Sequence, residues 1–386
     1  MQYPQLYDMG PTAQLMLMGL LVAGGPLVWV WRKSRGASPG RRLQLLTALT
    51  LFLTFDLVLF GAFTRLTDSG LGCPDWPGCY GHASPLGAAG HINQAVSVLP
   101  DGPVTHGKAW VEMIHRYLAT GVGVLILAMT LWAWALRRQL SVSPWWPTLT
   151  LFWVCLQGAF GALTVTMKLF PAIVTLHLLG GMVLLALLRK QALHFGQSLH
   201  PAATGTPPHE LQPGLYRLWL VVTGLVWLQI ALGGWVSTNY AVLACSEFPS
   251  CQGSWWPDMN FADGFTVWRA LGVDALGHPL PFSALTAIHY VHRLSAYLVF
   301  IGIGLLAWKL FQVKSLRSAA KWLVMLVLWQ FATGLSNVIL DWPLLAAVAH
   351  TGGAAGLVIV LTGVWAASPV QEPSTVPTVS SQRLHA

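Results

Sequence analysis

The chain has 386 residues, of which 55% are hydrophobic and only 9% are charged. Soluble domains carry about 25% charged residues, so the composition excludes an ordinary soluble protein and predicts a polytopic membrane protein. The formal net charge of +8 does not indicate a nucleic-acid partner, because the positive residues fall in short loops between apolar runs. The chain also has no aromatic-basic RNA motif and no phosphate-binding glycine loop.

Apolar runs long enough to cross a bilayer of about 30 Å recur along the whole chain. They occur at residues 12–31, 44–65, 111–135, 146–167, 171–188, 214–236, 285–308, 321–340 and 344–366. The first run has no basic segment before it, so we interpret it as a retained span and not as a signal peptide.

The distribution of charge predicts the orientation. Most of the 21 Lys and Arg residues fall in loops on one side of the predicted spans. The positive-inside rule places that side in the cytoplasm, the N-terminus outside and the C-terminus inside. We therefore expect an integral protein of a bacterial-type inner (plasma) membrane.

Two pairs of cysteines fall in loops on the opposite, outer side. Cys73 and Cys79 lie in one Gly/Pro-rich loop, and Cys245 and Cys251 lie in another with the same spacing. An oxidising outer compartment permits a disulfide in each loop. Free thiols or a metal site are the alternatives.

The second half of the chain repeats the first. Gly61 matches Gly233, both cysteine pairs match, and His115-Arg116 matches His292-Arg293. The repeat predicts an all-α membrane protein with two pseudo-symmetric four-helix bundles in parallel orientation, plus one extra N-terminal helix. The predicted parts are the extra helix and a basic loop (1–43), the first half (44–188), a cytoplasmic linker (189–213), the second half (214–366) and a disordered tail (367–386).

Four histidines occupy matched positions inside predicted spans, namely His115, His177, His292 and His350. Each is roughly four to seven residues from the outer end of its run, which corresponds to a depth of ~6–11 Å. Two imidazoles facing each other across a four-helix bundle can bind a porphyrin iron from both sides. A lone intramembrane histidine is more often a core residue or a proton relay, but the paired pattern favours one porphyrin per half. The spacing of His289 and His292 leaves a copper site as a minor alternative.

Charged residues accompany these histidines. Arg65, Arg116 and Arg293 lie near the outer face, where they can pair with porphyrin propionates or extend to lipid headgroups. Glu112 shares a helix face with His115, whereas the second half has His289 at that position.

A carboxylate at this depth is costly unless it has a function, such as accepting protons during an oxidation. The difference between the halves predicts a reactive first half and an electron-carrying second half. A structural glutamate that is hydrogen-bonded across the bundle is the alternative.

Together these motifs resemble the heme A synthase family over roughly residues 44–366. The residues that carry the resemblance are Thr64-Arg65-Leu66-Thr67, Ser69-Gly70-Leu71, Cys73, Cys79, Glu112, His115-Arg116, His177, His292-Arg293 and His350. The run at 12–31 is additional to the family core, and His289 beside His292 departs from the family pattern.

The resemblance implies oxidation of the C8 methyl of heme O to a formyl group, which gives heme A for cytochrome c oxidase. It implies that His115 and His177 hold the substrate or product heme, that His292 and His350 hold a heme b cofactor, and that Glu112 is catalytic. It also implies heme O synthase as substrate donor, oxidase assembly factors as partners, a separate electron donor and a membrane lipid environment. A diheme b-type electron-transfer protein and a heme transporter are the rival hypotheses.

Overall fold

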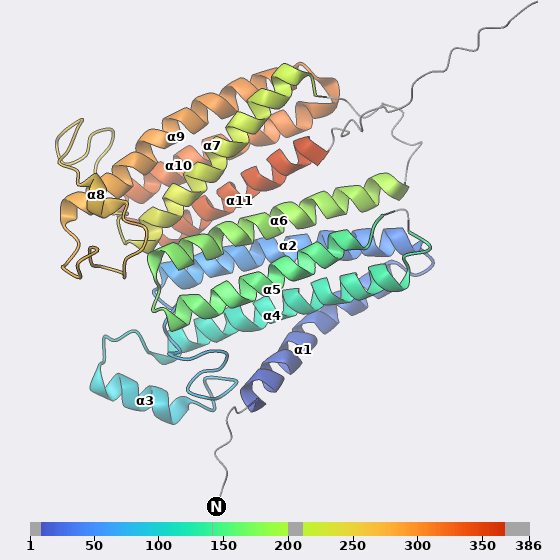
Figure 1. Cartoon of the computed structure of the whole chain (residues 1–386), viewed down its shortest axis with the longest axis horizontal. Coiled ribbons are helices and arrows are strands. Elements are labelled where there is room, and N and C mark those ends of the chain that lie inside the picture. The colour runs from blue at the N-terminus through green and yellow to red at the C-terminus, as the bar shows by residue number, and fades with distance from the viewer. Residues whose placement is uncertain (1–8, 141, 200–210, 367–386) are drawn as a thin grey trace, which may run out of the picture.

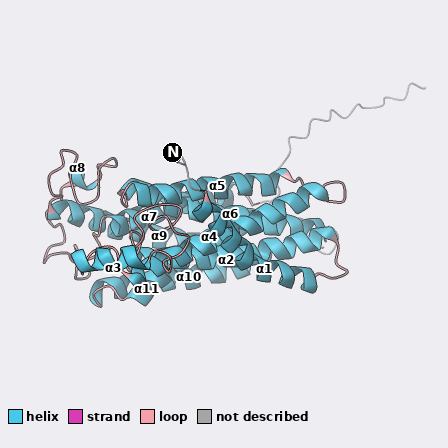
Figure 2. Cartoon of the chain, turned by 90° about the horizontal axis from the view of Figure 1, so that it is seen from below, coloured by secondary structure: helices cyan, strands magenta, loops and turns pink. Residues whose placement is uncertain are grey.

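The computed structural model describes residues 9–140, 142–199 and 211–366. The tail expected at 367–386 lies outside the described residues, as does part of the expected linker. The described residues form α-helices, one 3-10 turn (η1) and loops, without a named strand (Figure 2). The long helices are α1 (Gly10–Lys33), α2 (Pro39–Leu66), α4 (His106–Ala135), α5 (Trp145–Thr166), α6 (Pro171–Leu199), α7 (Pro213–Thr238), α9 (Phe282–Phe311), α10 (Arg317–Ile339) and α11 (Leu344–Ala366).

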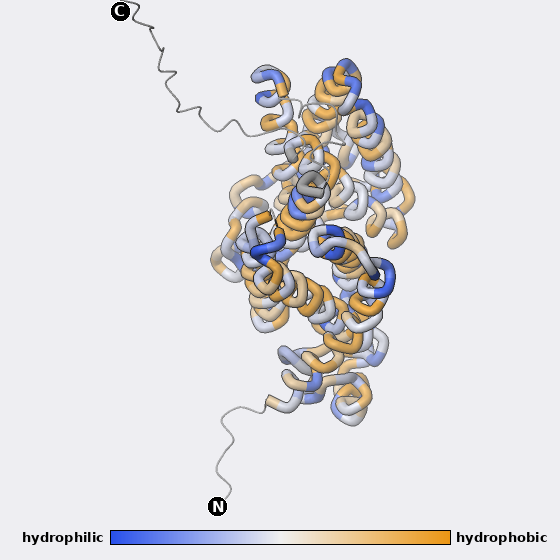
Figure 3. The backbone as a smooth tube through the Cα atoms, turned by 90° about the vertical axis from the view of Figure 1, so that its right-hand side faces the viewer, coloured by the Kyte–Doolittle hydropathy of each residue, from blue (hydrophilic) through white to orange (hydrophobic). Residues whose placement is uncertain are grey.

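Nine helices of the described residues are long and apolar enough to cross a membrane. The prediction of an all-α polytopic membrane protein is therefore confirmed. Viewed along the helices, the tube is mainly hydrophobic along the spans and hydrophilic at many of the turns (Figure 3). Because the backbone groups of a helix bond to one another, such helices satisfy their own hydrogen bonds inside a bilayer.

Short helices and long loops gather at one end of the molecule (Figure 1). α3 (Ala89–Val98) lies in the loop between α2 and α4, and α8 (Phe261–Gly264) lies in the loop between α7 and α9. We call this the cysteine-loop end, and we call the opposite end the linker end. The sequence pattern did not predict α3, which forms within a loop rich in turn residues.

Two helices differ in length from the sequence expectation. α4 begins at His106, because the Thr105 side chain accepts a hydrogen bond from the backbone N–H of Lys108 and caps the helix. α6 continues to Leu199 into the segment expected as linker. Lys190 in this extension lies over the rings of Trp146 and Trp365.

Each half is a four-helix bundle in which the histidine-bearing helices are diagonal to each other. In the first half α2 packs against α4 and α6, and α5 packs against the same two helices. In the second half α7 packs against α9 and α11, and α10 packs against the same two. α4 and α6 therefore face each other across the first bundle, as α9 and α11 do across the second. α1 packs mainly against α4 at the edge of the first half (Figure 1).

The contacts between the halves are reciprocal. α6 packs against α7, and the equivalent helices α11 and α2 also pack against each other. At the cysteine-loop end, Arg65 Nη2 donates to the Ser237 carbonyl at 2.6 Å, and the Tyr240 hydroxyl donates to Asp68 Oδ1 at 2.7 Å. Each of these two pairs is separated by 172 residues. Because the partners occupy equivalent positions in the two halves, both bonds lie close to a pseudo-twofold axis.

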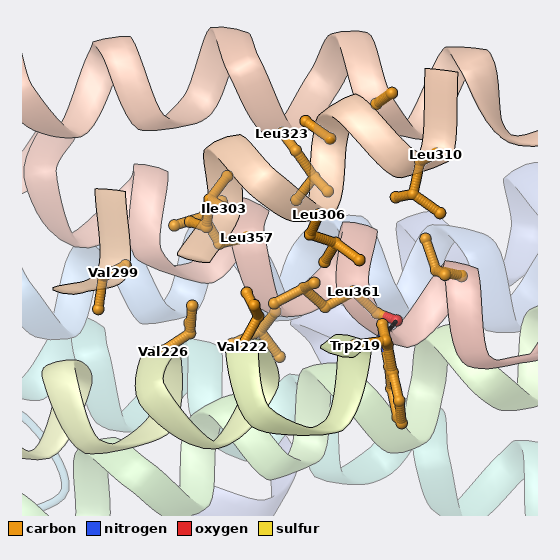
Figure 4. Close-up of a cluster of buried hydrophobic side chains, with 14 of the residues drawn as sticks. Trp219, Val222, Val226, Val299, Ile303, Leu306, Leu310, Leu323, Leu357 and Leu361 are labelled. Carbon is orange, nitrogen blue, oxygen red and sulfur yellow. Dashed lines mark hydrogen bonds between the residues drawn. The ribbon is translucent and has the colours of Figure 1, made fainter. Parts of the chain in front are cut away.

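The packed apolar cores lie on the linker side of the histidines. In the second half, Val299, Ile303, Leu306 and Leu310 of α9 meet Trp219, Val222 and Val226 of α7 and residues of α10 and α11 (Figure 4). A second core cluster packs α2, α4 and α6 of the first half, again on the linker side of the histidines. The close-packed interiors thus hold the bundles together at the linker end and leave the histidines toward the cysteine loops.

Candidate functional site

The first half places His115 and His177 on diagonal helices, each opposite a glycine. A Cβ built on Gly61 of α2 would lie 3.1 Å from Cε1 of His115, and one built on Gly161 of α5 would lie 3.5 Å from Cε1 of His177. The Phe60 ring lies parallel to the His115 ring, with centroids 6.1 Å apart. The glycines give the imidazoles room between helices that pack closely.

The second half repeats this arrangement with His292 and His350. A Cβ on Gly233 of α7 would lie 3.0 Å from Cε1 of His292, and one on Gly334 of α10 would lie 3.2 Å from Cε1 of His350. His115 and His177 lie on diagonal helices of one bundle, and His292 and His350 lie on diagonal helices of the other. The binding of one porphyrin by each couple stays a prediction.

The ring nitrogens of these four histidines are suited to binding a metal through Nε2. In the described part of the chain the side-chain hydrogen bonds of His292 and His350 use Nδ1, and Nδ1 of His115 and of His177 is buried without a partner. All four imidazoles are half-buried, so each keeps accessible surface. A neutral imidazole with a free nitrogen is the usual axial ligand of a heme iron. The donor set therefore fits one porphyrin per half.

Other metals fit less well. Among the described residues, no group of three or more His, Cys, Asp and Glu side chains is placed to hold a metal ion. His289, which left a copper site as an alternative, is buried, and its Nδ1 lies 3.0 Å from the Ala241 carbonyl. Nδ1 of His289 is therefore hydrogen-bonded to the backbone of the cysteine loop and is not free to bind a metal together with His292.

Glu112 is buried, with 4% of its surface exposed, and it links α4 to the first cysteine loop. The backbone N–H of Cys73 donates to Oε2 at 2.8 Å, and Arg116 Nη2 donates to Oε1 at 2.5 Å. Both carboxylate oxygens thus accept a hydrogen bond, one from the loop backbone and one from Arg116. The carboxyl group of Glu112 lies one helical turn from His115.

Each cysteine loop is closed by a disulfide, Cys73–Cys79 in the first half and Cys245–Cys251 in the second. The prediction of disulfides in both loops is confirmed. Cys73 and Cys79 are fully buried against α4, as part of a small apolar cluster with Ala109 and Met113. The first disulfide loop therefore packs directly over the helix that carries Glu112 and His115.

The arginine after each helix-borne histidine holds the adjacent disulfide loop. Arg116 Nη1 donates to the carbonyls of Asp75 at 3.0 Å and Pro77 at 3.1 Å, and also to that of Gly78. Arg293 Nη1 donates to the carbonyls of Glu247 and Ser250, both at 2.9 Å. The sequence repeat could place these arginines beside the loops, but it could not reveal carbonyl acceptors. Their expected pairing with porphyrin propionates stays a prediction.

The two arginines differ in charge compensation. Arg116 forms an ion pair with Glu112, whereas in the described residues Arg293 has no carboxylate within ion-pair distance. Arg65 lies between the halves, where it pairs with Asp68 at 3.2 Å and stacks over the Tyr240 ring at 4.0 Å. Of Arg65, Arg116 and Arg293, only Arg293 thus has no carboxylate partner among the described residues.

Three polar residues that the sequence analysis did not single out surround the second pair. Gln229 and Ser295 contact the His292 region, and Thr333 contacts His350. A further carboxylate, Asp56, is exposed on α2 one helical turn from Phe60, which stacks on His115. A comparison of the two halves position by position would have found all four, since their counterparts are apolar.

A family model described as cytochrome oxidase assembly protein (COX15-CtaA) matches residues 44–362. The chain belongs to this family. The match spans both bundles with all four paired histidines, and it begins after α1. α1 is therefore additional to the part that defines the COX15-CtaA family.

Relatives in the COX15-CtaA family cover most of the chain. The heme A synthase of Shewanella oneidensis is 40% identical over 323 residues, which are 83% of this chain and 94% of that relative. The heme A synthase of Chelativorans is 30% identical and covers 81% of this chain and 87% of its own length. That of Halalkalibacterium halodurans is 26% identical and covers 80% and 91%.

Proposed function

We propose that the chain is a heme A synthase, an integral membrane oxidoreductase that converts heme O into heme A for cytochrome oxidase assembly. Its family membership and the 40% identity to a heme A synthase over 83% of the chain support this proposal. The observation that carries it at the level of the site is the pair of diagonal histidines in each bundle, with Nε2 free in all four. A protein that acts on one heme and carries another requires two such sites.

The two halves have different roles in this proposal. His115 and His177 hold heme O, the substrate, in the half that contains Glu112. His292 and His350 hold heme b in the half where His289 replaces the carboxylate. When bound, heme b supplies electron transfer between an external donor and the substrate site. The assignment rests on the position of Glu112, because a buried carboxylate that does no chemistry is costly in a membrane protein.

The reaction oxidises the C8 methyl of heme O in two steps. With dioxygen as the oxidant, each step consumes two electrons and two protons, inserts one oxygen atom into a C–H bond and releases the other oxygen atom as water. The first hydroxylation gives an alcohol, and the second gives a geminal diol that loses water to the formyl group. Glu112 relays protons in these steps, because it lies one turn from His115 and is held in place by the Cys73 N–H and by Arg116. The histidines orient the substrate, and the cysteine loop above them limits the access of water.

The arginines at the cysteine-loop end would hold the propionates of each macrocycle in this proposal. Arg293 is the strongest propionate partner, because no carboxylate side chain of the described residues neutralises it. Arg65 serves the same role at the junction of the halves. Arg116 contributes only Nε, because its Nη1 binds the loop carbonyls and its Nη2 binds Glu112. We place the cysteine loops on the outer face of a bacterial-type inner membrane, since most basic loops lie at the other end. Heme O synthase supplies the substrate, and oxidase assembly factors receive the product.

Pigment analysis tests the proposed function. The full chain is expressed with a supply of heme O, and the extracted hemes are separated by chromatography and identified by mass. The wild type is expected to yield heme A, and Glu112→Gln is expected to yield none. Glu247→Gln is the matched control, because Glu247 is an acidic residue of the second cysteine loop with no place in the substrate half.

Two outcomes count against the proposal. Recovery of unchanged heme O from the wild-type protein, with both hemes bound, would favour an electron carrier and refute the enzyme. Heme A formation by Glu112→Gln at the wild-type level would refute the role of Glu112 and leave the enzyme assignment in place.

A further inference from the structure

The two histidine pairs differ in what the second ring nitrogen contacts. In the second half, Nδ1 of His292 lies 3.1 Å from the amide nitrogen of Gln229, and Nδ1 of His350 lies 2.9 Å from the Thr333 hydroxyl. In the first half, Nδ1 of His115 and of His177 are buried and have no hydrogen-bond partner among the described residues. The same four-helix scaffold therefore presents two kinds of axial histidine.

The difference originates in single positions of the repeat. Gln229 lies four residues before Gly233, and the residue four before Gly61 in the first half is Leu57. Thr333 directly precedes Gly334, and the residue directly before Gly161 is Phe160. Since the glycines face the equivalent histidines in both halves, apolar side chains stand in the first half where polar ones stand in the second.

The contacts in the second half suit a histidine that binds a metal through Nε2. Such a histidine carries its proton on Nδ1 and needs an acceptor there. The Thr333 hydroxyl donates its own hydrogen to the Trp329 carbonyl at 2.7 Å, so a lone pair on its oxygen can accept from His350. Gln229 is fixed by the Ser295 hydroxyl and by the His292 carbonyl at 3.0 Å. The Gln229 amide nitrogen faces both Nδ1 and the His292 carbonyl. A flip of this amide, with the Ser295 hydroxyl donating to the His292 carbonyl, turns Oε1 toward Nδ1, where it accepts a hydrogen bond from a metal-ligating His292.

We propose that Gln229 and Thr333 are positioning residues that make the second half a retaining site for heme, and that Leu57 and Phe160 make the first half a releasing site. The inference rests on the proposed function, in which the second heme is a resident cofactor and the first is turned over. A hydrogen bond to Nδ1 fixes the ring and makes it a stronger ligand, and loss of such a partner typically weakens metal binding 10–100-fold. A substrate and product site benefits from weaker binding, because heme A must leave it.

The test measures heme loss from purified full-length protein, with excess apomyoglobin as the heme acceptor. His115→Ala and His292→Ala assign each phase of heme loss to one half. Gln229→Leu and Thr333→Val remove the two contacts and reproduce the apolar character of the first half, while Thr333→Ser keeps the hydroxyl as a matched control. We expect the loss rate from the second half to rise about tenfold or more in the first two variants and to stay near the wild-type rate in Thr333→Ser.

A second readout is the reduction potential of the retained heme. A stronger imidazole ligand favours ferric iron, so removal of the contacts should raise the potential. A tenfold loss of preference for ferric over ferrous iron corresponds to about 59 mV for one electron. The reverse variant, Leu57→Gln with Phe160→Thr, should slow heme loss from the first half. It also tests the proposal independently of whether the second-half variants fold.

The outcomes separate this inference from the proposed function. If second-half heme still requires His292 but its loss rate and potential are unchanged in Gln229→Leu and Thr333→Val, and the reverse variant does not slow loss, the inference is wrong and the proposed function stands. If the heme content does not depend on His292 or His350, the proposed function itself fails.

Discussion

The buried ion pair between Glu112 and Arg116 offers a sharp test of the site, through the substitution Glu112→Gln. The side chains of Glu112 and Arg116 are 5% and 10% exposed, and their contact of 2.5 Å is shielded from water. Breaking a buried pair by removing one charge costs about 3–5 kcal/mol, and a glutamine oxygen that still accepts the Cys73 N–H recovers about 1 kcal/mol. We therefore expect a loss of about 2–4 kcal/mol in the free energy of unfolding.

The assay combines thermal unfolding in detergent with heme A formation at matched protein levels. The expected result is a lowered unfolding temperature together with loss of heme A. Arg116→Leu should also destabilise the protein, since it leaves Glu112 unpaired and frees the carbonyls of the disulfide loop. An unfolding temperature equal to that of the wild type in Glu112→Gln would refute the view that this carboxylate is ionised and paired.

Other parts of the structure give further predictions. Replacing Cys73 and Cys79 by Ser opens a disulfide with a sequence separation of 6, which should cost about 2 kcal/mol. It should also reduce heme A formation more than the same change at Cys245 and Cys251, because only the first loop bonds to Glu112, the proposed catalytic carboxylate. Equal losses of activity from the two loops, measured at matched protein levels, would contradict this. Burial raises the pKa of the Tyr240 hydroxyl above its ordinary value of 10.0, so its contribution to the junction of the halves is complete below about pH 10 and is lost as pH rises further. Alkaline unfolding followed by circular dichroism should show this loss in the wild type and not in Tyr240→Phe.

The sequence was sufficient to predict the all-α membrane class and the two disulfides. Hydropathy depends on composition over about 20 residues, so each span could be found without knowledge of its neighbours. The disulfides were predictable because both cysteine pairs have the same short spacing. The couples His115/His177 and His292/His350 are expected from their matched positions in a repeated unit, and they stay a prediction.

Other features depend on contacts that a linear pattern does not contain. The carbonyls that bind Arg116 and Arg293 are backbone groups, and every residue has one. In the extension of α6 to Leu199, Lys190 contacts two tryptophans from other helices. The bonds that join Arg65 to Ser237 lie at the pseudo-twofold axis, whose position follows only from packed helices. A comparison of the two halves could have singled out Gln229 and Thr333 as polar residues at apolar positions. Only the structure shows that both contact Nδ1 of a histidine.

The central claim is that each bundle holds one macrocycle between its own histidines. The most direct test is the heme content and heme type of purified protein, measured for the wild type and for single alanine substitutions of His115 and His292. We predict that His292→Ala removes heme b while His115→Ala retains heme b and no longer binds heme O. Loss of both hemes from either variant with an intact fold, or of neither heme from both, would contradict the assignment of one macrocycle to each pair.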